Sequence, residues 1–184
     1  MKFSMRHASA VIAALAVAFV VATAALAATR AFDGLGAARD ATTQFKSVSL
    51  AQQAGYGLLK DKNGVACIAM DSMPGMGAMG VHYAKPALVG DGKLNVKTPE
   101  ALVYQPLAGG KLSLAAVEYV VLKKDWDRVY NNRPVMFGHT FNFTPAGNRF
   151  GLPAYYSLHV WLFKHNPSGK FSMWNPLVKC GGAK

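Results

Sequence analysis

Hydrophobic residues along the chain gather in short runs, separated by polar stretches that contain glycine or proline. The runs have the length of strands and lie at residues 65–69, 79–83, 101–105, 111–122, 138–143 and 155–163, with a shorter one at 171–174. Apolar runs of this length, bounded by turn residues, are typical of β-strands. The segment Ala108-Gly109-Gly110 separates the third run from the fourth and predicts a β-hairpin there.

Two other stretches follow a helical pattern. Residues 40–54 place apolar side chains on one stripe and end before Gly55, which predicts a helix that ends there. Residues 123–132 predict a second helix with three inward side chains, namely Trp126, Val129 and Tyr130. The strands collect in the middle and at the end of the chain and do not alternate with long helices. We therefore expect a single α+β domain with an antiparallel sheet or partial barrel, an N-terminal helix and one further helix.

The first 27 residues have a pattern of their own. A short basic start with Lys2 and Arg6 precedes an apolar stretch at residues 8–26, which ends in Ala25-Leu26-Ala27. This order of regions is typical of a secretory signal peptide, with cleavage before Ala28. A membrane anchor is the alternative, because the apolar stretch is nearly long enough to span a bilayer. Since the stretch is rich in alanine and no basic cluster follows it, we expect a Sec-type signal peptide and a periplasmic or secreted protein. No transmembrane segment is expected after cleavage.

Cleavage would leave residues 28–184, which is enough for about one domain, with residues 28–39 as a flexible lead-in. This mature chain would keep 18 Lys and Arg against 9 Asp and Glu, a formal charge of +9. Such a charge favours anionic partners, for example the surface of the cell envelope. Nucleic acid is not expected as a partner, because the chain is exported and its basic residues are scattered.

The chain contains two cysteines, Cys67 and Cys180. In an oxidising compartment an isolated pair is most simply a disulfide, which would join the first predicted strand to the C-terminal segment. The alternative is a pair of thiolate metal ligands, but the chain has no C-x-x-C spacing to support it.

Glu118 is the acidic residue with the most unusual setting. It is the only acid in the apolar run 112–122. A buried carboxylate must be neutralised, paired or bound to a metal, because leaving it bare costs several kcal/mol. His82 and His159 lie in similarly apolar predicted strands and are candidate partners.

Together, His82, Glu118 and His159 make a set of two histidines and one carboxylate. Such a set suits one divalent ion, Zn²⁺, iron or manganese, with an open coordination position. A metal-bound water there would permit hydrolytic or oxidative chemistry. The alternative is a structural hydrogen-bond network of the same residues. His139 is a reserve ligand, and His165 is expected in a surface turn.

Copper is a weaker alternative, suggested by four methionines at an interval of three: Met70, Met73, Met76 and Met79. Thioethers select Cu(I). However, Pro74 and the glycines of this segment rule out a regular helix, so the interval does not place the sulfur atoms on one face. Methionine also commonly fills gaps in cores and under loops.

Three aromatic residues in the C-terminal part of the chain could line a ligand pocket, namely Tyr155, Trp161 and Trp174. Arg149 would orient a polar group of the ligand there. The alternative is that they belong to the hydrophobic core. The chain has no G-x-S-x-G, P-loop or H-E-x-x-H motif, so no activity is assigned. Three classes of function remain: a protein with a mononuclear metal site, a small-molecule-binding protein with an aromatic pocket, and a structural envelope protein.

Three segments carry a resemblance to known proteins: residues 77–83, residues 156–167, and the ending 169–180 with Met173-Trp174-Asn175-Pro176. Together they resemble a group of exported bacterial proteins of unknown function, over residues 32–180. The resemblance supports export and implies no activity.

Overall fold

The computed structural model describes residues 34–70 and 72–181. The expected signal peptide, its cleavage point and residues 28–33 of the lead-in lie outside these residues. No helix within the described ranges is long and apolar enough to cross a membrane.

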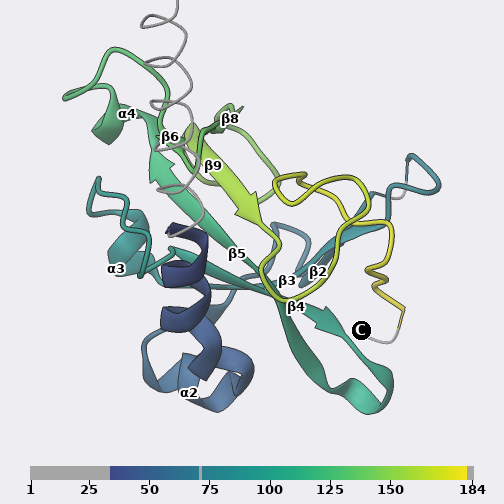
Figure 1. Cartoon of the computed structure of the whole chain (residues 1–184). Coiled ribbons are helices and arrows are strands. Elements are labelled where there is room, and N and C mark those ends of the chain that lie inside the picture. Colours follow the sequence, from purple (N-terminus) through teal and green to yellow (C-terminus); the bar gives the residue numbers. More distant parts are fainter. Residues whose placement is uncertain (1–33, 71, 182–184) are drawn as a thin grey trace, which may run out of the picture.

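The centre of the molecule is a seven-stranded antiparallel sheet (Figure 1). Its strands follow the order β1-β3-β4-β5-β9-β8, and β2 also pairs with β3. Their bounds are β1 Gly57–Leu58, β2 Cys67–Ala69, β3 Ala78–Ala84, β4 Ala101–Pro106, β5 Leu112–Leu122, β8 Asn142–Thr144 and β9 Tyr155–Val160. The predicted α+β class and antiparallel sheet are confirmed, and the sheet does not close into a barrel.

The predicted hairpin is formed by β4 and β5. The turn between them contains a short 3₁₀ helix, η2 (Ala108–Gly110). Gly109 and Gly110 have φ angles of 72° and 73°, which glycine adopts without the steric cost that a side chain would add. β5 is the longest strand and pairs with β4 on one side and with β9 on the other.

The N-terminal helical region begins earlier than the sequence indicated. Residues 34–42 are helical, followed by the 3₁₀ helix η1 (Thr43–Lys46) and by α2 (Val48–Gln53). The single helix predicted at 40–54 is therefore wrong in its extent. It is interrupted at Ser47, whose backbone is extended (φ −87°, ψ 115°). Part of the expected lead-in, residues 34–39, lies within the helix.

The second predicted helix is much shorter than expected. Only α4 (Lys123–Trp126) is helical, and the long connection before β4 contains one further turn of helix, α3 (Pro86–Val89). Val129 and Tyr130 are 68% and 49% exposed, so their inward placement was wrong. The inward placement of Trp126 is confirmed, because it packs against the core. Tyr130 stacks on the Trp126 ring at a centroid distance of 4.2 Å.

The predicted strand at 138–143 is divided into two. Its first half is β7 (His139–Thr140), which pairs with β6 (Val135–Met136) in a separate two-stranded sheet. Its second half is β8, at the edge of the main sheet. The predicted edge at 171–174 is not a strand; the residue that follows it, Asn175, forms an isolated bridge with Ala78.

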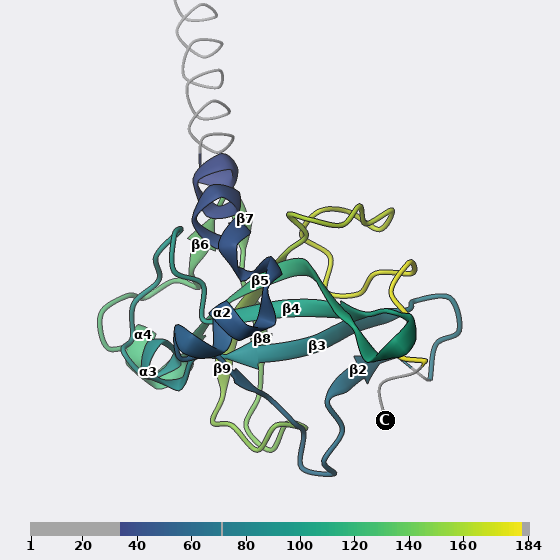
Figure 2. The ribbon, with the colours of Figure 1, turned by 90° about the horizontal axis from the view of Figure 1, so that it is seen from below.

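The two faces of the main sheet are covered by different segments (Figure 2). Helical residues Ala38, Phe45 and Ala51 pack on the face that carries Val117 and Tyr119. On the opposite face, Trp161 and Val178 form a smaller cluster with Val103 and Ala116. Both faces are therefore buried, which explains why β5 is apolar along nearly its whole length.

Cys67 and Cys180 form the predicted disulfide, with their Cα atoms 5.6 Å apart. The bond joins β2 to the C-terminal segment across 113 positions of sequence.

Candidate metal centre

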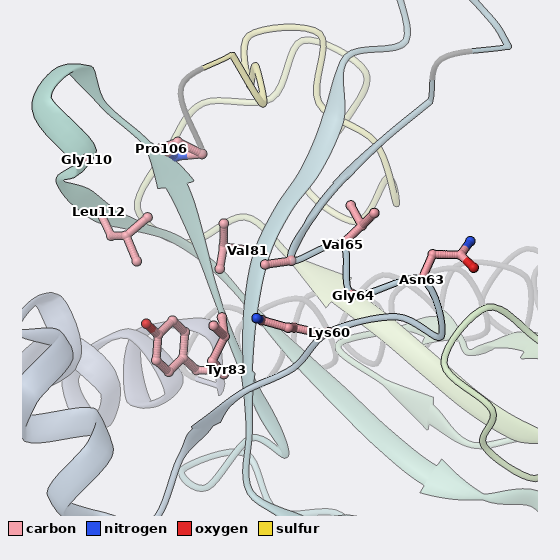
Figure 3. Close-up of a pocket in the computed structure, with 11 residues that line it drawn as sticks. Lys60, Asn63, Gly64, Val65, Val81, Tyr83, Pro106, Gly110 and Leu112 are labelled. Carbon is pink, nitrogen blue, oxygen red and sulfur yellow. The ribbon is translucent and has the colours of Figure 1, made fainter. Parts of the chain in front are cut away.

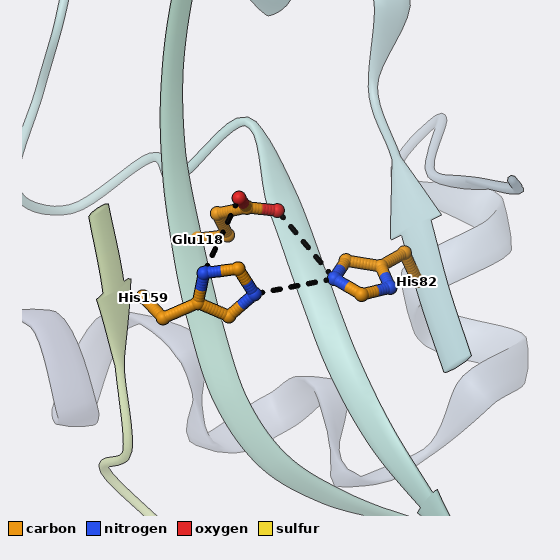
Figure 4. Close-up of side chains that lie close together, drawn as sticks. All are labelled: His82, Glu118 and His159. Atoms are coloured by element: carbon orange, nitrogen blue, oxygen red, sulfur yellow. Dashed lines mark hydrogen bonds and ion pairs between the residues drawn. The ribbon is translucent and has the colours of Figure 1, made fainter. Parts of the chain in front are cut away.

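Three neighbouring regions of the sheet bring His82, Glu118 and His159 together (Figure 4). His82 lies on β3, Glu118 on β5 and His159 on β9. Glu118 is directly opposite His159 in the pairing of β5 with β9. His82 lies further away, because β4 runs between β3 and β5.

β4, which lies between β3 and β5, leaves room for His82 to contact Glu118. Ala101 is the β4 residue opposite Glu118, and Val103 is opposite His82. Because side chains two residues apart point to the same face of a strand, Ala101 lies on the face of the cluster. Its small side chain lets His82 and Glu118 meet across the intervening strand.

The polar atoms of the cluster are close to one another. Nε2 of His82 lies 3.5 Å from Oε2 of Glu118 and 3.3 Å from Nε2 of His159. Nδ1 of His159 lies 3.3 Å from Oε1 of Glu118. One ligand atom from each residue can be chosen so that all three lie within 4.8 Å of one another.

These separations fit the coordination sphere of a small divalent ion. A tetrahedral ion with bonds of about 2.0–2.1 Å holds its ligand atoms roughly 3.3–3.4 Å apart. Each pair of residues in the cluster has one pair of atoms near this separation. His159 presents Nε2 to His82 and Nδ1 to Glu118, so an ion would engage one of its two nitrogens.

Both imidazoles are in the protonation state that binds metals. His82 is 2% exposed and His159 is 1% exposed. Burial disfavours the imidazolium form and lowers the pKa of each ring to about 4, although the nearby Glu118 opposes the shift at His82. Both rings are therefore neutral at neutral pH.

Burial has the opposite effect on Glu118. It raises the pKa of the carboxyl group, while His82 and a hydrogen bond from Ser157 oppose the shift. A divalent ion would stabilise the ionised carboxylate in this setting.

Hydrogen bonds, without a metal ion, could also hold the three side chains of the cluster together. A neutral imidazole has one N–H donor and one acceptor nitrogen. Protons on Nε2 of His82 and Nδ1 of His159 would direct one N–H toward His159 and the other toward Glu118. Nδ1 of His82 has no hydrogen-bond partner among the described residues, and neither has Nδ1 of His159, whose 3.3 Å approach to Glu118 lacks hydrogen-bond geometry. The structural network is therefore an alternative that leaves two buried nitrogens unsatisfied.

A loop covers the cluster. Phe150 meets the ring of His82 edge-on at a centroid distance of 6.2 Å. The preceding residue, Arg149, donates to Oδ2 of the buried Asp61 at 2.9 Å, and its carbonyl accepts from the backbone N–H of Lys62. The loop is thus tied to the turn that precedes β2.

An apolar cavity of about 300 Å³ adjoins the cluster at Glu118. Tyr155 is one of its walls, and Phe150 and Leu152 of the covering loop are others. Glu118 is the only charged residue in its lining.

The other residues proposed for a pocket lie apart from one another. Arg149 is engaged with Asp61, and Trp161 lines a different hollow together with Arg39. Trp174 accepts a hydrogen bond at its carbonyl from Asn166. Tyr155 alone of the four lines the cavity beside Glu118.

The remaining candidate ligands lie outside the cluster. His139 is exposed and stacks on Phe171 at a centroid distance of 3.7 Å. His165 is exposed, as expected for a surface turn. Met70 and Met73 line a hollow beside Cys180.

Sequence reasoning missed Glu100 and the loop contacts. Glu100 is 2% exposed, and its carboxylate accepts a hydrogen bond from the backbone N–H of Val120. The signal in the sequence that could have indicated the burial of Glu100 is its position directly before the apolar strand β4. The ion pair of Asp61 with Arg149 joins residues 88 positions apart and has no local signature.

A larger hollow of about 570 Å³ lies on the opposite face of the sheet (Figure 3). Val81 and Tyr83, which alternate with His82 along β3, are part of its lining. Lys60 reaches toward Tyr83, and the lining contains no acid and no histidine. This hollow therefore lacks the donors of the metal-type cluster.

Comparison with known proteins finds no family model that matches the chain, no similar curated protein and no similar solved structure. We therefore infer the function from the geometry of the cluster and its surroundings.

Proposed function

We propose that this protein binds one divalent metal ion through His82, Glu118 and His159. The observation that carries the proposal is the convergence of three buried donors from three strands, with separations that suit a single ion. Two neutral nitrogens and one carboxylate favour zinc, iron or manganese.

Three protein ligands would leave a coordination position open. A water molecule bound there would be activated by the ion, as in hydrolytic metal centres. Copper is disfavoured, because the donors are nitrogen and oxygen and because Met70 and Met73 line a separate hollow.

We also propose that the protein acts outside the cytoplasm, in the periplasm or as a secreted protein. The signal-peptide pattern of residues 1–27 supports this location. The disulfide supports it independently, because such bonds persist in oxidising compartments.

The test is the metal content of protein purified from the periplasm without a metal-affinity tag, measured by mass spectrometry. We expect nearly one ion per chain in the wild type, and loss of that ion in His82→Ala and His159→Ala. His139→Ala and His165→Ala are matched controls, since both side chains are exposed, and they should keep the ion.

Circular dichroism and thermal unfolding would show whether each variant is folded. A wild-type protein that holds no metal, even after incubation with each ion, would refute the proposal. The hydrogen-bond network would then be the better interpretation of the cluster.

A further inference from the structure

The cavity beside Glu118 is enclosed by apolar side chains from several segments, which a metal centre alone does not require. Its walls come from separate parts of the chain: Val89 of α3, Ala101 and Val120 of the sheet, and Leu152 of the covering loop. Apart from Glu118 these walls carry no charge. Ligand pockets are typically apolar cavities in which a few polar groups fix the orientation of the ligand.

The size of the cavity limits the ligand. A volume of about 300 Å³ lies at the lower end of ligand cavities. At ~30 Å³ for each water-sized group, it accommodates roughly ten non-hydrogen atoms, with the polar group of the ligand placed on the ion. This corresponds to one or two fused rings or a short aliphatic chain.

The net charge of the proposed metal centre indicates which polar group a ligand in the cavity would carry. A divalent ion with one carboxylate and two neutral imidazoles retains a charge of +1. An anionic oxygen ligand at the open position would neutralise this charge inside an apolar site, where an unbalanced charge is costly.

We infer that the cavity binds a small aromatic or aliphatic monocarboxylate, with the apolar body against Val89 and Leu152 and the carboxylate on the metal ion at Glu118. This inference rests on the proposed metal site. It goes beyond it by assigning a ligand class and a place for the ligand.

Isothermal titration of the full mature chain with zinc, and then with 2-naphthoate, tests the two proposals separately. Naphthalene-2-carboxamide is the uncharged control ligand. We expect 2-naphthoate to bind zinc-loaded protein saturably and at least tenfold more tightly than it binds zinc-free protein. The carboxamide should bind at least tenfold more weakly than 2-naphthoate.

Val89→Trp and Leu152→Trp fill the cavity from two different walls. Both side chains are only partly buried, so the larger ring can be accommodated at the rim. Each variant should weaken 2-naphthoate binding at least tenfold while zinc affinity stays within about twofold. Val135→Trp, at a position 63% exposed on β6, is the matched control and should bind like the wild type.

The outcomes are distinguishable. Zinc binding without saturable 2-naphthoate binding overturns the ligand inference and leaves the metal site intact. Equal 2-naphthoate affinity with and without zinc overturns the assignment of the carboxylate to the ion. Unchanged 2-naphthoate affinity in both cavity variants, with thermal unfolding confirming that they fold, overturns the cavity as its place. Absence of binding of zinc, iron and manganese alike refutes the metal site and, with it, the inference that depends on it.

Discussion

Glu118 lies on β5 and Glu100 lies directly before β4, and the surroundings of these two buried carboxyl groups give them different roles. Glu118 faces two neutral histidines, so an ion or a proton can be shared among three side chains. Glu100 has one backbone donor, Val120, and no cationic side chain pairs with it among the described residues. Burial raises the pKa of Glu100 to about 8.

This shift makes Glu100 a source of pH-dependent stability. In the unfolded chain a glutamate titrates near 4.3, whereas in the folded protein Glu100 keeps its proton up to about pH 8. Between these values the folded state holds a proton that the unfolded state releases. The stability from Glu100 is therefore complete below about pH 4 and is lost as the pH rises toward 8, by up to about 1.4 kcal/mol per pH unit.

Glu100→Gln should remove this dependence. The amide keeps an acceptor oxygen for the N–H of Val120 and cannot ionise. Urea unfolding at pH 5, 6.5 and 8 should show a flatter profile in the variant, with a gain of a few kcal/mol at most at pH 8. Asp40→Asn is the control, because Asp40 is exposed. Parallel profiles for Glu100→Gln and wild type would contradict the prediction.

At the scale of elements, the backbone of β3 approaches β4 closely at Gly80, two residues before His82. Gly80 has a φ of 111°, and a Cβ atom there would lie 2.5 Å from the carbonyl oxygen of Tyr104. A side chain at this position would have to push the two strands apart. Gly57 on β1 has no atom within 4 Å of its equivalent position.

Gly80→Ala should therefore destabilise the protein by about 2–3 kcal/mol, through both backbone strain and the clash. It should also weaken metal binding, because His82 is two residues away on the same strand. Gly57→Ala should change the free energy of unfolding by less than about 1 kcal/mol. Denaturant unfolding of both variants measures the difference, and equal effects would show that the close approach has no energetic consequence.

The loop over the cluster depends on Asp61. This carboxylate accepts from Arg149 and from the backbone N–H groups of Asn63 and Val65. Together these bonds hold the pKa of Asp61 below its usual value, mainly through Arg149.

Asp61→Ala should free the loop that carries Phe150. Three donors lose their partner, so we expect lower stability and faster hydrogen exchange in residues 147–152. Zinc should also dissociate faster when Phe150 no longer covers His82. Asp40→Asn is again a suitable control. Unchanged exchange in this loop would show that other contacts hold it.

The sequence predicted the strands better than the helices. The runs predicted as strands at 111–122 and 155–163 contain β5 and β9, which are buried on both faces, although β9 ends at Val160. The pattern at 123–132 predicted too long a helix: Trp126 packs against the core as expected, whereas Val129 and Tyr130 are exposed. The interruption at Ser47 and the division of 138–143 depend on tertiary packing that a local pattern does not contain.

The candidate site was predictable for a specific reason. A lone acid in an apolar strand needs a partner, and two histidines in similar strands could supply one. Their convergence required the strand order, since His82 reaches Glu118 across β4. The cavity could not be predicted, because its walls come from separate segments that only the fold brings together.

At the scale of the whole molecule, one covalent bond holds the C-terminal segment to the sheet. This segment supplies Val178 to the smaller cluster of the core. Among the described residues after Val160 none belongs to a strand of the main sheet, so the disulfide and the bridge between Ala78 and Asn175 tie this segment to it.

The double variant Cys67→Ala, Cys180→Ala should lose about 2–5 kcal/mol of stability, since closing a long loop restricts the unfolded chain. Guanidinium unfolding with and without a reductant measures this effect. Reduction should lower the free energy of unfolding of the wild type to that of the double variant. It should leave the free energy of unfolding of the variant unchanged. If a reductant leaves the stability of the wild type unchanged, the disulfide contributes little to it.

The three candidate ligands are 36 and 41 positions apart along the chain. Consequently no short segment of the nascent polypeptide can hold an ion with all three, and the site comes into existence only when β3, β5 and β9 have assembled. A chain that crosses the membrane unfolded, as a Sec-type signal implies, would cross it without its metal. The choice of ion would then be made by the supply of metals where the chain folds, and not by the cytoplasm in which it is synthesised.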